Sequence, residues 1–232
     1  MDKVRIILPL AAMLLLALSV SCGAAPSVLG TSGNILTPDD TILAPGGFNL
    51  GYHGINSIGN SSENVNIYAA NVGLLPKLEV GLASVTHGNS EVIINAKYRL
   101  LTETLGRPAV TVGAIDLGAE ITNEHGAYIM LSKNLTTFAE EIANKASRPI
   151  RGHLGLGRGV VRGVFVGLDW TLNPKLSLMA EYISDSKLRD LDGEGICNAG
   201  IRYAITKEVR IDLGTIDFED FTFGASFQAL RF

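Results

Sequence analysis

The last segment of the chain places the strongest constraint on its fold. From Phe221 onward, aromatic and aliphatic residues alternate with small or polar residues over most of the run, which ends at Phe232. An amphipathic last strand ending on an aromatic residue is typical of bacterial outer-membrane β-barrels, where the apolar side of the strand faces lipid. We therefore expect a lipid-facing final strand, with Phe232 as the C-terminal signal for the barrel-assembly machinery.

The first residues predict export. Lys3 and Arg5 precede an apolar run at 6–20, which has the length of a signal-peptide core and falls short of the ~20 residues of a membrane-spanning helix. Cleavage after the small residues 21–25 would make residues 1–25 a signal peptide. Cys22 leaves a lipoprotein with a lipidated amino-terminus open, although Ser19 replaces the leucine that is usual in a lipoprotein signal.

Composition excludes several classes of protein. A formal net charge of −4 and a pI of about 5.6 provide no basic surface for nucleic acid. Two cysteines, Cys22 and Cys197, make no disulfide framework. No second apolar stretch has the length of a membrane helix. Because only helices and closed barrels satisfy every backbone polar group in lipid, a barrel is the expected membrane-spanning form.

Alternation with period 2 predicts an all-β fold: a single antiparallel transmembrane β-barrel of about 12 strands at 47–232, preceded by an irregular periplasmic or lumenal segment at 26–46. Short turns at Pro76, Pro174 and Thr206 alternate with longer polar connections, which predicts that both termini are periplasmic. The long connection 135–150 is an exception, and its residues 136–145 fit either a short helix or a solvated loop. The expected strands lie near 47–55, 64–73, 77–86, 91–101, 108–118, 126–134, 151–159, 163–172, 176–184, 195–205, 208–217 and 221–232.

The later strands have one apolar and one polar face. Val164, Val166, Leu168 and Trp170 share one face of their strand, while Asp169 lies on the other, which predicts lipid outside and a polar lumen inside. The facing of the strands near 64–73, 108–118 and 126–134 is not fixed by pattern. A soluble, secreted β-barrel that binds a small ligand would show the same alternation with its faces exchanged, and it stays open as an alternative.

Inward charges are the nearest feature to a functional cluster. Antiparallel pairing is expected to bring Asp169 close to Glu181, and Arg202 close to Arg210. Two acids and two bases side by side on one wall of the lumen would orient charged solutes in a narrow pore. Alternatively, these charges would form salt bridges with one another and close the lumen. The full candidate cluster is Glu79, Lys97, Arg99, Asp169, Glu181, Arg202, Arg210 and Asp212.

No cofactor, metal site or catalytic motif is predicted. His53, His87, His125 and His153 are dispersed and lack the spacing of metal ligands. We expect a protein that is not an enzyme. An outer-membrane acyl hydrolase stays open as an alternative, although no serine is singled out beside a histidine.

The segment before and within the first expected strand resembles the amino-terminal signature of YjbH-like outer-membrane proteins. It contains a Gly-x-x-Gly opening with a proline, and then a Pro-x-Gly-Phe phrase that leads to Gly-Tyr-His. The residues of this signature are Gly30, Gly33, Pro38, Pro45, Gly47, Phe48, Gly51, Tyr52 and His53.

This resemblance implies a link to exopolysaccharide production or export, and partners among polysaccharide or envelope secretion components. It transfers no catalytic residue. The sequence as a whole therefore predicts a narrow conduit or structural component in the outer membrane of a Gram-negative (diderm) bacterium.

The first test is electrophoretic. A barrel in the outer-membrane fraction should resist SDS until it is boiled, so its gel mobility should differ between heated and unheated samples. Soluble material without this shift would support the secreted binding protein instead.

Overall fold

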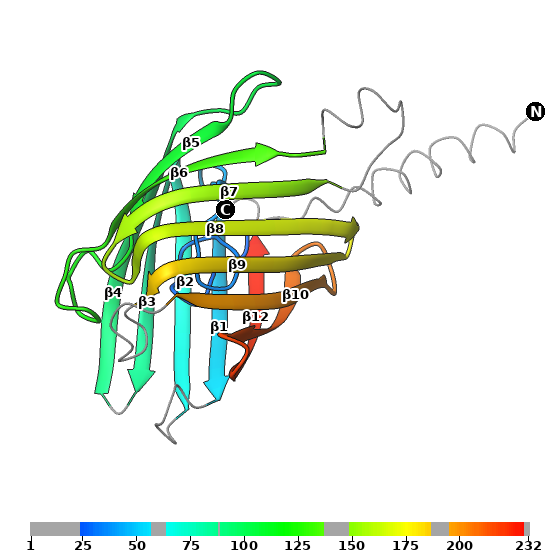
Figure 1. The fold of residues 1–232 in the computed structure, drawn as a ribbon. Coiled ribbons are helices and arrows are strands. Elements are labelled where there is room, and N and C mark those ends of the chain that lie inside the picture. The colour runs from blue at the N-terminus through cyan, green and yellow to red at the C-terminus, as the bar shows by residue number, and fades with distance from the viewer. Residues whose placement is uncertain (1–23, 57–63, 88, 137–148, 187–194, 230–232) are drawn as a thin grey trace, which may run out of the picture.

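Twelve antiparallel strands close into a single barrel in the computed structural model, which describes residues 24–56, 64–87, 89–136, 149–186 and 195–229 (Figure 1). Within this part of the chain, no helix has the length and hydrophobicity needed to cross a membrane. The strands are β1 (Phe48–Asn56), β2 (Val65–Leu75), β3 (Leu78–His87), β4 (Asn89–Leu101), β5 (Ala109–Ala114), β6 (Ala127–Asn134), β7 (Ile150–Arg158), β8 (Val161–Asn173), β9 (Leu176–Ser186), β10 (Ile196–Ala204), β11 (Val209–Ile216) and β12 (Asp220–Ala229).

The first and last strands close the barrel. Phe48 at the start of β1 lies opposite Val72 of β2 on one side and Ala229 of β12 on the other. Every strand therefore pairs with a neighbour on each side. The barrel has no open sheet edge whose backbone N–H and C=O groups would lack hydrogen-bond partners in lipid. The prediction of a closed antiparallel barrel of 12 strands is confirmed.

One predicted strand is too long. The alternation at 108–118 suggested a full strand, but β5 ends at Ala114. At Asp116 the backbone takes a φ of 61°, and the Asp116 carboxylate accepts hydrogen bonds from the backbone N–H groups of Glu120 and Ile121. This carboxylate cap turns the chain out of the strand, and Ile115 packs into the barrel interior.

The two ends of the barrel differ. We call the end with the start of β1 and the end of β12 the proximal end, and the opposite end the distal end. The tight turns after β2 and β8 are proximal, whereas β1 and β9 end, and β2 and β10 begin, at the distal end. Residues 137–148, where a short helix was considered, lie outside the described residues, as do Cys22 and Phe232.

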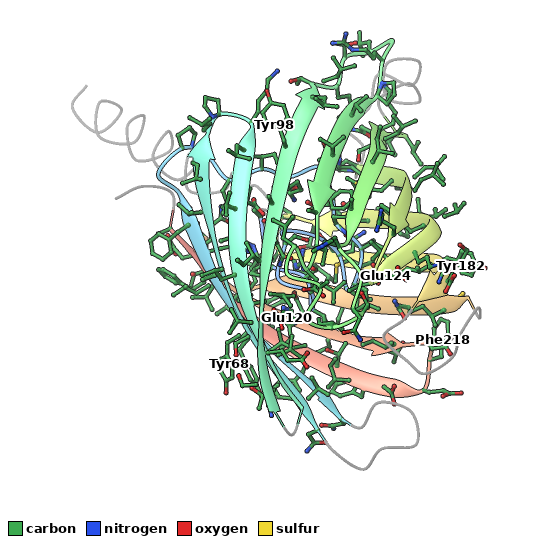
Figure 2. All side chains as sticks on the ribbon, turned by 90° about the vertical axis from the view of Figure 1, so that its left-hand side faces the viewer. Tyr68, Tyr98, Glu120, Glu124, Tyr182 and Phe218 are labelled. Carbon is green, nitrogen blue, oxygen red and sulfur yellow. The ribbon has the colours of Figure 1, made fainter. Side chains whose placement is uncertain are left out.

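Large apolar side chains cover the outside of the barrel. Val164, Val166, Leu168 and Trp170 are exposed on β8, as their alternation predicted. Tyr68, Tyr98 and Tyr182 also lie on the outer surface (Figure 2). The structure fixes the ambiguous strands too, because Ile129 and Leu131 of β6 face outward while Met130 faces inward. A secreted soluble barrel would show the reverse, so the outer surface is that of a transmembrane barrel.

The interior has an apolar layer toward the distal end. Ile55, Ile93, Phe165, Ile183 and Ile196 are each at most 3% exposed and belong to one hydrophobic cluster. They lie in the distal halves of their strands, whereas the inward residues of the proximal halves are mostly polar. The distal side of the lumen is thus packed like a protein core, and the proximal side needs polar partners.

The lipid-facing surface is tested by a charge at mid-strand. Leu168→Arg should destabilise the folded barrel by about 2–4 kcal/mol, the usual cost of arginine at the bilayer midplane. The matched control is Phe218→Arg, which places the same charge in the exposed turn between β11 and β12. Urea titration of the refolded protein in lipid vesicles measures both, and equal stability of the two variants would contradict this assignment of the surface.

Candidate functional site

A segment of the chain before β1 fills the proximal half of the lumen. We call residues 24–43 the plug; they form the blue loop enclosed by the strands in Figure 1. Residues 24–38 and Leu43 are buried, so this irregular segment lies in the lumen rather than against the periplasmic rim.

The plug folds through its own backbone bonds. Ser27 N–H donates to Thr31 O at 2.6 Å and Val28 N–H donates to Ile35 O at 2.8 Å. Gly30 has a φ of +95°, and a Cβ on it would lie 2.7 Å from the Cβ of Ala83, so both backbone conformation and space require glycine here.

Both ends of the plug lie on the same side of the barrel. The carbonyl of Ala24 accepts from Asn49 near the start of β1, and Leu43 N–H donates to Glu79 near the start of β3. The apex reaches mid-barrel, where the carbonyl of Leu29 accepts from Asn95 at 2.8 Å. The plug is therefore a finger inserted from the proximal end, and no strand has to be threaded for it to leave.

Two buried glutamates of the barrel wall bind backbone N–H groups of the plug. Glu79 accepts from Ser32 N at 3.0 Å, from Ser32 Oγ at 3.0 Å and from Leu43 N at 3.1 Å. Glu181 accepts from Leu36 N at 2.7 Å, and from Thr37 N and Oγ1 at 3.0 and 2.7 Å. Hydrogen bonds to a charged acceptor are about twice as strong as neutral ones, so these two carboxylates hold the plug in the lumen.

Two buried cations bind the plug carbonyls. Lys97 Nζ donates to Ser32 O at 2.7 Å. Arg202 donates to Gly33 O at 3.0 Å and also forms a two-point ion pair with Asp212 at 2.8 and 3.0 Å. Acidic wall side chains thus meet plug N–H groups, and basic ones meet plug carbonyls.

The expected pairing of like charges is wrong. Glu181 lies opposite Gly167 and Asp169 opposite Met179, because the β8–β9 ladder shifts register between Thr171 and Asn173. In the β10–β11 ladder, likewise, Arg202 lies opposite Asp212, and Arg210 lies opposite Ala204. Ile205 N–H donates to Val209 O, so the short turn predicted at Thr206 contains three residues, Thr206 to Glu208. The wall therefore alternates in charge instead of gathering acids and bases separately.

Charged side chains from two strands meet at the proximal mouth of the lumen. Lys97 Nζ lies 3.3 Å from Asp39 Oδ1, and Arg99 donates to the carbonyl of Asp40. Arg151 NH2 lies 2.9 Å from Asp40 Oδ2. The sequence had predicted Lys97 and Arg99 as lumenal, whereas Arg151 was missed because it stands at the edge of a strand whose inward face is mostly Gly and His.

Arg151 has a second acidic partner outside the strands. Its NH2 also lies 2.9 Å from Glu103, in the connection between β4 and β5, and Lys133 lies 3.6 Å from the same carboxylate. Burial raises the pKa of Glu103, but the backbone N–H of Asn134 and the charge of Arg151 lower it more, so the pKa lies below its ordinary value. Glu103 is therefore charged at neutral pH.

A polar cavity of about 110 Å³ separates the plug from one side of the wall. No group of three or more His, Cys, Asp or Glu side chains among the described residues is placed to hold a metal. The cavity is lined by Asn34, Asp39, Asp40, Thr41, Arg151, His153, Asp169, Thr171, Ser177, Met179 and Arg202.

A Ser–His–Asp chain crosses three neighbouring strands beside this cavity. Ser132 Oγ lies 2.7 Å from His153 Nδ1, and His153 Nε2 lies 2.7 Å from Asp169 Oδ2. No sequence spacing pointed to this group. Ser132 is 1% exposed and does not line the cavity, so its hydroxyl is closed to a substrate while the plug is in place. In this arrangement the chain orients His153.

The glycines and histidine of the sequence signature make the plug and its seat. Gly30, Gly33 and Pro38 lie in the plug itself. His53 Nε2 lies 3.1 Å from the carbonyl of Pro26, and a Cβ on Gly51 would lie 2.8 Å from the ring of Pro26.

The remaining signature residues belong to the linker or to the outer surface. Pro45 and Gly47 connect the plug to β1. Phe48 and Tyr52 pack on Phe227 and Phe223 of β12, with ring centroids 6.1 and 5.7 Å apart, across the seam that closes the barrel.

Comparison with known proteins finds likeness in structure only. No family model and no curated protein matches the chain. The KdgM porin matches with a TM-score of 0.50 and 8% identity over 78% of this chain and 97% of that one. The outer membrane protein Omp33 of Acinetobacter baumannii matches with a TM-score of 0.48 and 12% identity over 80% of this chain and 97% of that one. The COG4313 outer membrane channel of Pseudomonas putida F1 matches with a TM-score of 0.47 and 9% identity over 84% of this chain and 100% of that one. At these identities, the likeness to the KdgM porin shows the fold alone.

The contribution of the wall glutamates is tested with a reporter cysteine. In a Cys197→Ser background, Ser27→Cys places a thiol on a fully buried position of the plug, and a protein without Ser27→Cys serves as the blank. Glu79→Gln with Glu181→Gln should raise the rate of maleimide labelling at least 10- to 100-fold, because this factor requires a loss of only about 1.5–3 kcal/mol in plug binding, the value of a single charged hydrogen bond. Asp185→Asn, on β9 but paired with Arg162, is the control and should leave the rate unchanged. Equal labelling of all variants would show that the glutamates do not hold the plug.

Proposed function

We propose that this protein is a narrow conduit across the outer membrane of a diderm bacterium, closed at rest by its own plug. The observation that carries the proposal is the binding of plug N–H groups by Glu79 and Glu181. These buried carboxylates belong to the wall, and they would line a polar lumen if the plug left. A wall meant only for permanent packing would be expected to carry apolar side chains there, which avoid the desolvation cost of buried charge.

The lumen has two seals. The plug occupies its proximal half, and the apolar layer around Ile93, Phe165 and Ile183 occupies the distal half. Plug residues Val28, Leu29, Ile35 and Leu36 belong to the same apolar cluster, so withdrawal of the plug would also remove part of the distal packing. A narrow apolar constriction that opens by wetting is a known form of gate.

The cellular role that we propose is the handling of exopolysaccharide or other envelope material. It rests on the resemblance of residues 30–53 to the signature of YjbH-like proteins. Gly30, Gly33 and Pro38 of this signature lie in the plug, and Gly51 and His53 contact it. Lipid, the barrel-assembly machinery and envelope secretion components are the proposed partners. A closed structural barrel, with a plug that never leaves, is the second candidate, favoured by the many hydrogen bonds that the plug makes.

Conductance in planar bilayers separates these two functions. Wild-type protein should conduct rarely, whereas Glu79→Gln with Glu181→Gln should show frequent openings, because the plug leaves the lumen more often. Asp185→Asn should behave as wild type. If the double variant releases its plug, as the Ser27→Cys reporter would show, yet stays silent, the conduit is wrong and the structural role stands.

A further inference from the structure

We propose that Lys97, Arg99 and Arg151 form an anion-binding site at the proximal mouth of the lumen, and that Asp39 and Asp40 of the plug occupy it as an internal substitute for the ligand. The class of ligand is a small solute with a carboxylate, phosphate or sulfate group. This inference deepens the proposed conduit by naming the charge of the solute that it admits, and it rests on the plug being able to leave.

Three cations converge on two consecutive plug residues. Lys97 Nζ meets both the carbonyl and the carboxylate of Asp39, at 3.2 and 3.3 Å. Arg99 binds the carbonyl of Asp40, and Arg151 binds its carboxylate. Lys97 and Arg99 come from inward positions of β4, while Arg151 comes from β7, so the site is formed from both sides of the mouth.

Withdrawal of the plug removes two negative charges from this mouth. Lys97 would keep Glu79 at 3.9 Å, and Arg151 would keep Glu103 at 2.9 Å. The Arg99 guanidinium donates to the plug carbonyl of Asp40, and its Nε has no hydrogen-bond partner among the described residues. The acids left near the three cations would be Glu79, Glu103 and Asp169, and Asp169 binds His153. Loss of the two plug carboxylates would make the mouth more positive by two charges, which favours the entry of anions.

The adjoining cavity provides room for a ligand. It is lined by Asp39, Asp40, Asp169 and Arg151 and extends past Thr171, whose hydroxyl group can donate to an anion. Arginine and lysine side chains match carboxylate and phosphate oxygens in geometry and charge.

The test uses competition between an added anion and the plug. With the Ser27→Cys reporter, citrate should raise maleimide labelling several-fold over sodium chloride of the same ionic strength, because citrate competes with Asp39 and Asp40 for the three cations. The double variant Arg99→Gln, Arg151→Gln should show the same rate of maleimide labelling in citrate and in chloride, even if its rate in chloride differs from that of the protein without these two substitutions. Arg162→Gln, at the distal end of β8, is the matched control and should keep the effect. Identical labelling in citrate and chloride would overturn the anion site.

Ion selectivity provides a second readout and separates the two proposals. In the Glu79→Gln, Glu181→Gln background, the reversal potential in a KCl gradient should shift toward cations when Arg99→Gln and Arg151→Gln are added, and not when Arg162→Gln is added. All comparisons are made within this background because it already lacks two negative charges. A citrate effect without conductance would reject the conduit and keep the site, whereas conductance with neither a citrate effect nor a selectivity shift would reject the site and keep the conduit.

Discussion

The structure depends on the pairing of buried polar groups in a lumen that lipid surrounds. Glu79, Lys97, Glu181 and Arg202 face inward on four different strands, and each is at most 6% exposed. A buried charge without partners would cost several kcal/mol. The backbone of the plug supplies those partners, with N–H groups for the glutamates and carbonyls for the lysine and arginine. Plug and wall therefore stabilise each other.

This mutual dependence explains the division of the interior. The distal half depends mainly on apolar contacts, because isoleucine, methionine and phenylalanine side chains pack against each other and against the apolar apex of the plug. The proximal half is polar and communicates with a cavity at the mouth. If the plug leaves the lumen as we propose, water can replace its N–H groups at the wall glutamates, and water or anions can replace its carbonyls at the basic side chains.

Particular residues show where prediction from sequence ended. The two faces of β8 followed from alternation, since Val164, Val166, Leu168 and Trp170 repeat with period 2. That the apolar face points outward was expected from the amphipathic last strand, which is typical of barrels in lipid. The inward charges Glu79, Lys97, Glu181 and Arg202 followed from the same rule. Their partners did not, because a register shift of one or two residues in a ladder changes which charges meet, and bulges such as that between Thr171 and Asn173 leave no clear mark in sequence.

The sequence by itself determined the strand number and the division of the later strands into one apolar and one polar face, because these depend on local alternation. Only the tertiary structure decided what fills the lumen. The contacts between Glu181 and Leu36, or between Arg151 and Asp40, join residues more than 100 positions apart, and no local pattern encodes such distances. The Ser132–His153–Asp169 chain has the same origin, because barrel closure and register alone bring its members together.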